Sequence, residues 1–231
     1  MLLDTYQFSY LIYTLLLLLI WSVLFISNKS YRKESLAVGL LFGIAGIIVA
    51  GIYVVDWWNP ITVFGKSTGI EDFIFSFSIG GIGSIIYSVI FNKKIIKKDK
   101  RFDLYKNKKF ILTAIVLAFV FFVSFYLLSL DSFLSSLLGF TVVISYMLYR
   151  RKDLTKNALI SGVLLSLVTI IPYIVIEFIT PGWVENTWYF NFTYLPRISI
   201  FHDPIEDIIW FMFAGAFTST WYKYWREVYF V

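Results

Sequence analysis

"PIEDIIWF" at residues 204–211 and "GIEDFIF" at residues 69–75 decide the fold, because both open a long apolar run with the same pair of acidic residues. Each is preceded by the same features in the same order: a basic turn, an apolar run, and a loop with acidic and tryptophan residues. This order predicts one three-helix unit that occurs twice. The two copies occupy residues 1–95 and 131–231, and residues 96–130 join them as a basic loop and a connector helix.

The composition indicates a membrane protein, since 59% of the residues are hydrophobic, 21% are aromatic and only 15% are charged. A helix needs about 20 apolar residues to cross a hydrocarbon core of roughly 30 Å. Runs of this kind lie near residues 8–27, 34–55, 70–91, 109–129, 132–149, 157–179 and 204–225. We therefore predict an all-α, polytopic membrane protein of about seven transmembrane helices. A single connector helix gives the two three-helix repeats the same orientation, so they are parallel repeats.

The basic residues predict the orientation in the membrane. Eighteen of the 20 Lys and Arg residues fall in segments on one side of the predicted spans, and only Lys66 and Arg197 fall on the other. By the positive-inside rule, the basic side is cytoplasmic, the N-terminus is outside and the C-terminus is inside. We therefore expect a protein of the plasma (cytoplasmic) membrane, whose positive charge faces anionic lipid headgroups and not a nucleic acid.

Several kinds of cofactor site are excluded. The chain has no cysteine and one histidine, so Cys-ligated metal centres and multi-histidine sites cannot form. The glycine-rich stretch "SIGGIGS" at residues 78–84 lies inside an apolar run and follows no strand, which predicts close helix packing instead of dinucleotide or phosphate binding. We expect chemistry by carboxyls, hydroxyls, amides and aromatic rings, without a metal or other cofactor.

The acidic pairs have a structural interpretation as helix starts. In "TGIED" Thr68 precedes Glu71 by three residues, and in "DPIED" Asp203 precedes Glu206 by three, with Pro204 between them. A Ser, Thr or Asp N-cap followed by Glu at the third helical position is typical of a capping box, and proline favours the first helical position. Both glutamates could therefore serve only to start a helix.

The second acid of each pair favours a functional interpretation. Asp72 and Asp207 are one residue beyond the capping position, and adjacent helix residues point about 100° apart. Carboxyls on a helix that enters a membrane usually face a cavity or a partner. Asp56 and Glu177, near the ends of the preceding runs, add one more carboxyl to each half. The sequence thus predicts a carboxyl cluster at the non-cytoplasmic end of both copies.

Aromatic residues surround these acids. They occur in "DWWNP" at residues 56–60, in "GWVENTWYFNFTYL" at residues 182–195 and at Trp210. Tryptophan and tyrosine commonly form a belt at the membrane interface, which is one interpretation. The other is a pocket wall, since the faces of aromatic rings stabilise cations. Carboxyls and aromatic rings in an apolar site are what carbocation chemistry on a hydrocarbon requires.

The second half resembles the small integral-membrane lycopene cyclases, which occur as two homologous chains or as one fused chain. The resemblance rests on "EFITPGWVENTWYFN" at residues 177–191, on Arg197 and on "PIED", which matches the family's Pro-x-Glu-(Glu/Asp) motif at a helix start. The first copy, "TGIED", lacks the motif proline, so its role need not equal that of the second.

The resemblance implies an isomerase that closes the open ψ-end of lycopene or a related polyene to a β-type ring, without net redox change. Glu206 is then the first candidate for the acid, with Asp207, Glu71 and Asp72 as partners or as the final base. The residues expected to bind the substrate are Asp56, Glu177, Trp57, Trp58, Trp188, Asn191, Arg197, His202 and Trp210. The expected partners are the polyene and the lipid bilayer. As protein partners we expect a second copy of the chain, in a homo-oligomer, or other carotenoid-pathway enzymes.

Two other functions stay open at this point. A three-plus-one-plus-three arrangement of helices is also found in sugar transporters, although the acids here lie at one end of the helices and not at the middle. A non-catalytic polyene-binding protein would need the same aromatic surroundings. A retinal protein fits less well, because the last run has no lysine before Lys223 at its cytoplasmic end.

Overall fold

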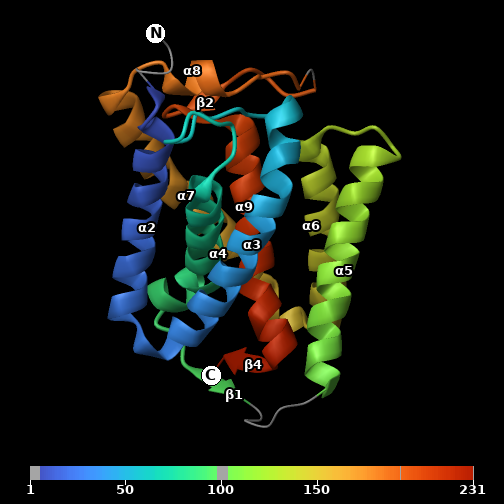
Figure 1. Ribbon diagram of the computed structural model, residues 1–231. Helices are drawn as coiled ribbons and strands as arrows, with labels where there is room; N and C mark the ends of the chain where they lie inside the picture. Colours follow the sequence, from blue (N-terminus) through green and yellow to red (C-terminus); the bar gives the residue numbers. More distant parts are fainter. Residues whose placement is uncertain (1–5, 98–103, 193, 231) are drawn as a thin grey trace.

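Seven long helices form a bundle within residues 6–97, 104–192 and 194–230, which are the residues that the computed structural model describes (Figure 1). The long helices are α2 (Ser9–Ser27), α3 (Arg32–Asp56), α4 (Ile70–Ile90), α5 (Leu104–Tyr126), α6 (Ser132–Arg150), α7 (Thr155–Ile179) and α9 (Ile205–Arg226). The shorter helical pieces are η1 (Lys29–Tyr31), η2 (Lys152–Leu154) and α8 (Trp183–Thr187). Each apolar run became one long helix, with its ends shifted by a few residues, so the all-α prediction is confirmed. Residues 98–103 of the predicted basic loop lie outside the described residues.

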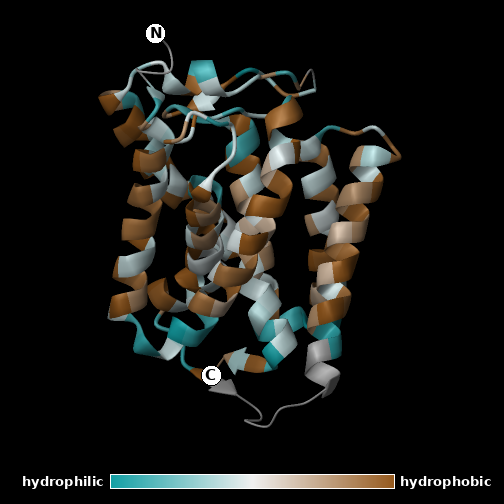
Figure 2. Ribbon diagram, viewed as in Figure 1, coloured by the Kyte–Doolittle hydropathy of each residue, from teal (hydrophilic) through white to brown (hydrophobic). Residues whose placement is uncertain are grey.

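Apolar side chains cover the outer surface of the bundle. Figure 2 shows hydrophobic residues along the outward faces of α2, α3 and α5, and hydrophilic residues mainly near the two ends. Leu19, Ile48 and Phe119 are among the large apolar side chains that are more than half exposed. Within the described residues, six of the long helices are long and apolar enough to cross a membrane. The chain is therefore a polytopic membrane protein.

The seventh long helix, α9, is less apolar because it lies inside the bundle. It carries Glu206, Asp207, Lys223 and Arg226, and most of its residues are buried. It packs against α4, α5, α6 and α7, so protein and not lipid surrounds most of its length (Figure 1). Charged groups on a membrane helix that face the bundle interior can find partners there. The predicted span at residues 204–225 is thus a helix that crosses the bundle at its centre.

The glycines of residues 78–84 allow α4 to approach its neighbours closely. A Cβ on Gly80 would lie 2.5 Å from the Cβ of Phe42 on α3, and a Cβ on Gly83 would lie 2.4 Å from the Oγ1 of Thr218 on α9. Neither space can hold a methyl group. The prediction that this stretch serves helix packing is confirmed.

A buried ion pair joins α9 to α3 and α4 at the end of the bundle away from α8. The Nζ of Lys223 lies 2.6 Å from the Oε1 of Glu34, and both side chains are buried. The same nitrogen donates to the carbonyl oxygens of Ser84, at 2.9 Å, and Ser219, at 3.0 Å. An ammonium group has three protons to donate, and each has an acceptor here.

Short strands and loops close the two ends of the bundle. At one end β1 (Ile95–Lys97) pairs with β4 (Val228–Phe230), and at the other β2 (Ser199–Ile200) pairs with β3 (Asp203–Pro204), both antiparallel. A single β-bridge joins Trp58, after α3, to Trp188, after α8. The N–H of Tyr189 also donates to the carbonyl oxygen of Trp57 at 3.0 Å. The loops of the two halves therefore meet directly.

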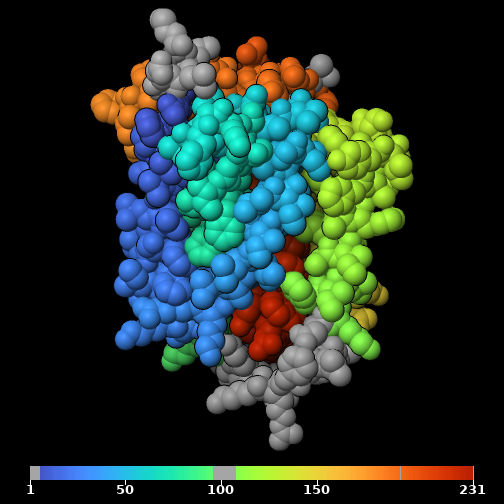
Figure 3. All heavy atoms as spheres, viewed as in Figure 1, coloured from blue at the N-terminus to red at the C-terminus, as the bar shows by residue number. Residues whose placement is uncertain are grey.

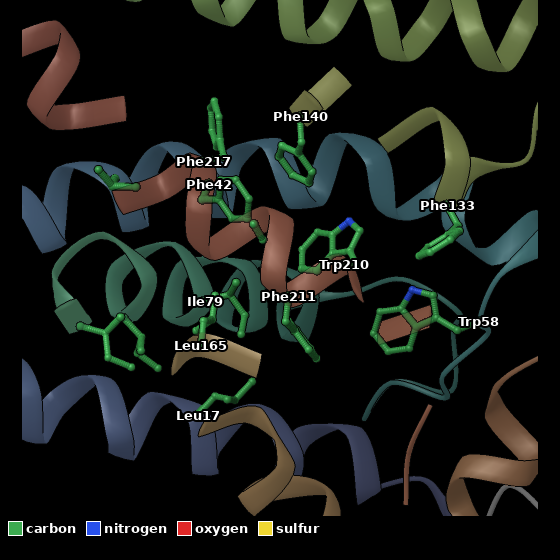
Figure 4. Close-up of a cluster of buried hydrophobic side chains, with 14 of the residues drawn as sticks. Leu17, Phe42, Trp58, Ile79, Phe133, Phe140, Leu165, Trp210, Phe211 and Phe217 are labelled. Atoms are coloured by element: carbon green, nitrogen blue, oxygen red, sulfur yellow. The ribbon is translucent and has the colours of Figure 1, made fainter. Parts of the chain in front are cut away.

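Aromatic side chains fill the core between α3, α6 and α9. Figure 4 shows Phe42, Phe140, Phe217 and Trp210 gathered there, with Phe211 directed toward α4 and α7. The ring centroids of Phe140 and Phe217 are 5.4 Å apart, and those of Trp210 and Phe211 are 5.5 Å apart. The position of α9 is therefore fixed by rings along one side of the helix.

Candidate active site

A small chamber lies inside the bundle, beneath the loops at the α8 end. Its volume is about 20 Å³, which is room for about one water molecule. The walls come from α2, α3, α4, α7, α9 and the two loops joined by the β-bridge. The lining residues are Tyr13, Tyr53, Trp57, Trp58, Phe75, Tyr173, Trp188, Trp210, Phe211 and Asp207. Nine of these ten residues are aromatic, and the tenth is a carboxylic acid.

Asp207 is held in this chamber by two hydrogen bonds from aromatic side chains. The hydroxyl of Tyr173 donates a short hydrogen bond to its Oδ2, and the Nε1 of Trp188 donates to its Oδ1 at 3.1 Å. Both donors are buried. Hydrogen bonds of this kind favour the ionised form of a carboxyl over the neutral form. The site is therefore built to stabilise the negative charge that Asp207 acquires when it gives up a proton.

Two more carboxyls, those of Asp203 and Glu206, are buried beside Asp207 without satisfied oxygens. Asp203 has no exposed surface, and neither of its carboxyl oxygens has a hydrogen-bond partner. The Oε1 of Glu206 is also buried without a partner. Among the described residues, no three His, Asp or Glu side chains are grouped so that they could hold a metal ion. The cluster therefore contains acidic groups that neither a cap nor an ion pair explains.

The capping-box interpretation of residues 203–206 is wrong. Pro204 and not Asp203 is the N-cap residue of α9, and no side chain donates to or accepts from this helix start. The reason is the β2–β3 hairpin, which holds Asp203 in extended backbone opposite Ile200. The three-residue spacing was present in the sequence, but the hairpin moved the helix start by one residue.

Replacing Asp203 by Asn should flatten the pH dependence of stability. Burial raises the pKa of Asp203 well above its usual range, and the negative charges of Asp207 and Glu206 raise it further. A carboxyl whose pKa is higher in the folded than in the unfolded state contributes its full stabilisation below the unfolded-state pKa of about 3.9. This stabilisation is lost as the pH rises through the folded-state pKa. Thermal unfolding in detergent should thus show a falling Tm above about pH 4 for the wild type, and a smaller fall for Asp203→Asn.

The control for this measurement is Glu185→Gln, which removes an exposed carboxyl of α8. It should leave the pH dependence of the Tm as in the wild type. Equal slopes for all three proteins would show that the Asp203 carboxyl does not hold its proton in the folded state.

The acidic pair of the first half is placed differently from the prediction. Asp72 and not Glu71 caps α4: its Oδ2 accepts from the N–H of Gly69 at 2.7 Å, while Thr68 takes no part. The Oδ1 of Asp72 accepts from the hydroxyl of Tyr10 at 2.9 Å. Glu71 is buried, and its Oε1 accepts from the N–H of Val63 at 2.7 Å. The prediction that Thr68 and Glu71 form the cap is wrong, because α4 begins at Ile70, which puts Asp72 at the third helical position.

Asp56 and Glu177 hold backbone in place at the ends of their helices. Asp56 accepts from the N–H and the hydroxyl of Ser132 at the start of α6, at 2.9 and 2.5 Å. Glu177 accepts from the N–H groups of Gly182 and Val184, both at 2.9 Å. Neither carboxyl lines the chamber. Each carboxylate therefore holds the adjacent turn of the backbone in place.

The other seven predicted substrate-binding residues divide into two groups. Trp57, Trp58, Trp188 and Trp210 are buried and line the chamber, as listed above. Asn191, Arg197 and His202 are exposed and lie outside it. The guanidinium of Arg197 lies 4.9 Å above the ring of Phe190. The structure thus brings the tryptophans together with Asp207 and leaves the three polar residues on the surface.

Sequence reasoning missed the tyrosines of the site. Tyr10 and Tyr173 bind the two aspartates, and Tyr13 and Tyr53 line the chamber. A tyrosine inside an apolar helix needs a partner for its hydroxyl, and this was the available signal. The partner could not be named, because Tyr10 and Asp72 are 62 residues apart in the chain.

A family model described as "Lycopene cyclase" matches residues 4–90 and 131–225. The two matched regions fall within the two predicted copies and leave out residues 91–130, which join them. No curated protein and no solved structure matches the chain.

Proposed function

The chain belongs to the lycopene cyclase family, and from this membership we propose that it closes the open ψ-end of lycopene, or of a related polyene, to a β-type ring. The protein is a carotenoid cyclase of membrane-spanning helices. The observation that supports the reaction most directly is the position of Asp207, a carboxylic acid in a chamber whose other walls are aromatic. The reaction adds one proton to the polyene and removes one, so it changes neither the formula nor the redox state of the substrate.

We assign the first proton transfer to Asp207. The ion pairs formed within the described residues use Lys109, Arg151 and Lys223, so no cation there is paired with the carboxyls of the cluster. Asp203, Glu206 and Asp207 are buried together without a counter-ion, and the repulsion between their negative charges favours the protonated form within this cluster. When Asp207 protonates the terminal double bond, the hydrogen bonds from Tyr173 and Trp188 stabilise the carboxylate that forms. This reassigns the acid from Glu206, which the sequence favoured and which does not line the chamber.

The aromatic walls then stabilise the carbocation. Protonation of the terminal double bond leaves a tertiary cation, and the neighbouring double bond attacks it to close the ring. Trp58 lies 5.3 Å from Trp188 and 5.8 Å from Phe75, measured between ring centroids, so several ring faces surround the space. A cation over such faces is stabilised without a counter-ion that could add to it. The rings also exclude water, which would otherwise capture the cation.

We propose Asp72 as the base that removes the final proton. Asp72 does not line the chamber, but it lines the neighbouring cavity, which shares Trp58 and Phe75 with the chamber. Its two oxygens accept from Tyr10 and from the N–H of Gly69, which suits a group that acts as a carboxylate. Asp207 of the second repeat would then act as the acid, and Asp72 of the first repeat as the base.

We further propose that the chamber lies at the non-cytoplasmic side of the plasma membrane. Eighteen of the 20 basic residues belong to segments predicted on the opposite side. The end of a bilayer-spanning polyene reaches the depth of the interface, which is where the outer ends of α3, α4 and α9 would lie. This orientation can be tested by labelling single introduced cysteines, since the chain has none of its own.

Expression in a bacterium that accumulates lycopene tests the proposed reaction. We expect the cells to form γ- or β-carotene, resolved by chromatography and absorption spectra, while cells with an empty vector retain lycopene. If the membranes contain the folded protein and lycopene is unchanged, the chain is not a lycopene cyclase. Lycopene that co-purifies unchanged would instead support a polyene-binding role.

A further inference from the structure

A second, larger cavity opens between α3 and α5. Within the described residues, these two helices make little contact with each other beyond the edge-to-face packing of Tyr53 against Phe121, whose ring centroids are 6.2 Å apart, whereas α3 packs closely on α4 and α5 on α6. Figure 3 shows α9 at the bottom of the gap between α3 and α5. The cavity has a volume of about 370 Å³, and α3, α4, α5, α6 and α9 contribute its walls. It is a cleft in the side of the bundle, at the level of the apolar outer surface.

Small side chains on the two flanking helices leave this space free. Ala45 on α3 and Ala114 and Ala118 on α5 all line the cleft. The deep wall of the cleft includes Phe42 of α3 and Phe140 of α6, which are both buried. The lining is almost entirely apolar, so the cleft favours a hydrocarbon over water.

The cleft adjoins the chamber that holds Asp207. Tyr53, Trp58, Phe75 and Trp210 line both cavities, so the two spaces share one aromatic wall. Asp72 lies on the cleft side of this wall. The chamber alone, at about 20 Å³, is too small for more than part of an end group. A substrate whose end reaches Asp207 therefore has to place the rest of its length elsewhere, and the cleft lies on the other side of the shared aromatic wall.

We propose that the cleft between α3 and α5 binds the polyene chain behind the reacting end, and that the carotenoid enters through it sideways from the bilayer. This inference rests on the proposed cyclase function. A lipid acyl chain is the other hydrocarbon that a bilayer could supply, but only a substrate places its end at the carboxyl beyond the shared wall. The cleft thus selects for a long, linear and rigid hydrocarbon with a free end.

Filling the cleft with a large side chain tests the proposal. Ala118→Trp places a ring in the cleft, and Leu112→Trp is the matched control on the opposite face of the same helix, where Leu112 is half exposed and does not line the cleft. Each purified variant is assayed with lycopene and with a synthetic polyene that carries the same open end but is cut to about half the length.

We expect Ala118→Trp to lower kcat/KM for lycopene by about tenfold or more, and for the short polyene by less than about twofold. Leu112→Trp should match the wild type with both substrates.

If Ala118→Trp cyclises both substrates like the wild type, the cleft does not hold the polyene. The same result together with loss of co-purified phospholipid would identify the occupant as a lipid. Ala45→Phe, from the other side of the cleft, repeats the test if Ala118→Trp does not fold. A wild type inactive on both substrates would contradict the cyclase function itself.

Discussion

Replacing Asp207 by Asn should abolish ring closure while the protein stays folded. Asn has the same shape and can still accept from Tyr173, but it has no proton to give to an alkene. Loss of a general acid costs about 10²–10⁴-fold in rate, and we expect the kcat for lycopene to fall within or beyond this range. Pigment analysis by chromatography, after normalising for the amount of protein in the membrane, measures the effect.

Glu206→Gln is the matched control for Asp207→Asn. Glu206 is the adjacent residue of α9 and is also buried, but it does not line the chamber. We expect Glu206→Gln to lower the rate by less than about tenfold, because Glu206 does not reach the reacting atoms in the chamber. The reverse outcome, with an active Asp207→Asn and an inactive Glu206→Gln, would return the role of the acid to Glu206.

Lys223→Met should destabilise the protein by about 3–5 kcal/mol, because it removes one partner of a buried ion pair. The pair is inaccessible to solvent, and Lys223 also donates to the carbonyl oxygens of Ser84 on α4 and of Ser219 on α9 itself. Adding Glu34→Gln should restore part of the loss, since the carboxylate that faced the ammonium is then replaced by a neutral amide. Unfolding in mixed micelles with increasing SDS, followed by circular dichroism, measures both changes.

Lys109→Met provides the comparison for a surface ion pair. Lys109 lies 2.7 Å from Glu227, and both side chains are partly exposed. A partly exposed pair pays a smaller desolvation penalty than a buried one, so Lys109→Met should destabilise the protein by less than Lys223→Met. If Lys223→Met costs no more than Lys109→Met, the buried pair is not a significant source of stability.

The helices could be predicted from the sequence because each property that sets them is local. Apolar runs of about 20 residues match the thickness of a hydrocarbon core, and their ends therefore came within a few residues of the observed ones. The glycines of residues 78–84 were also interpreted correctly, since a small residue inside an apolar helix has few uses other than close packing. Even α9 was predicted, although it is less apolar than the other long helices and is held in the bundle by its packing.

The site was predicted in part, and its missing details depend on contacts between distant residues. The tryptophans and the acidic pairs were recognised because they lie together in the sequence. The caps were assigned to the wrong residues, since spacing does not show whether a hairpin precedes Asp203 or where α4 begins. Arg197 and His202 lie close to Asp207 in the chain but face away from the chamber.

The proposed entry of substrate through the cleft between α3 and α5 has a consequence for how substrate concentration is defined. With access from the side of the bundle, the substrate dissolves in the lipid phase and never passes through water. The Michaelis constant is then a mole fraction of carotenoid in the membrane, and added lipid or detergent acts as a diluent even when the aqueous volume is unchanged. Rates compared between membranes of different lipid content have to be expressed on that scale, because the bilayer is the solvent of the reaction.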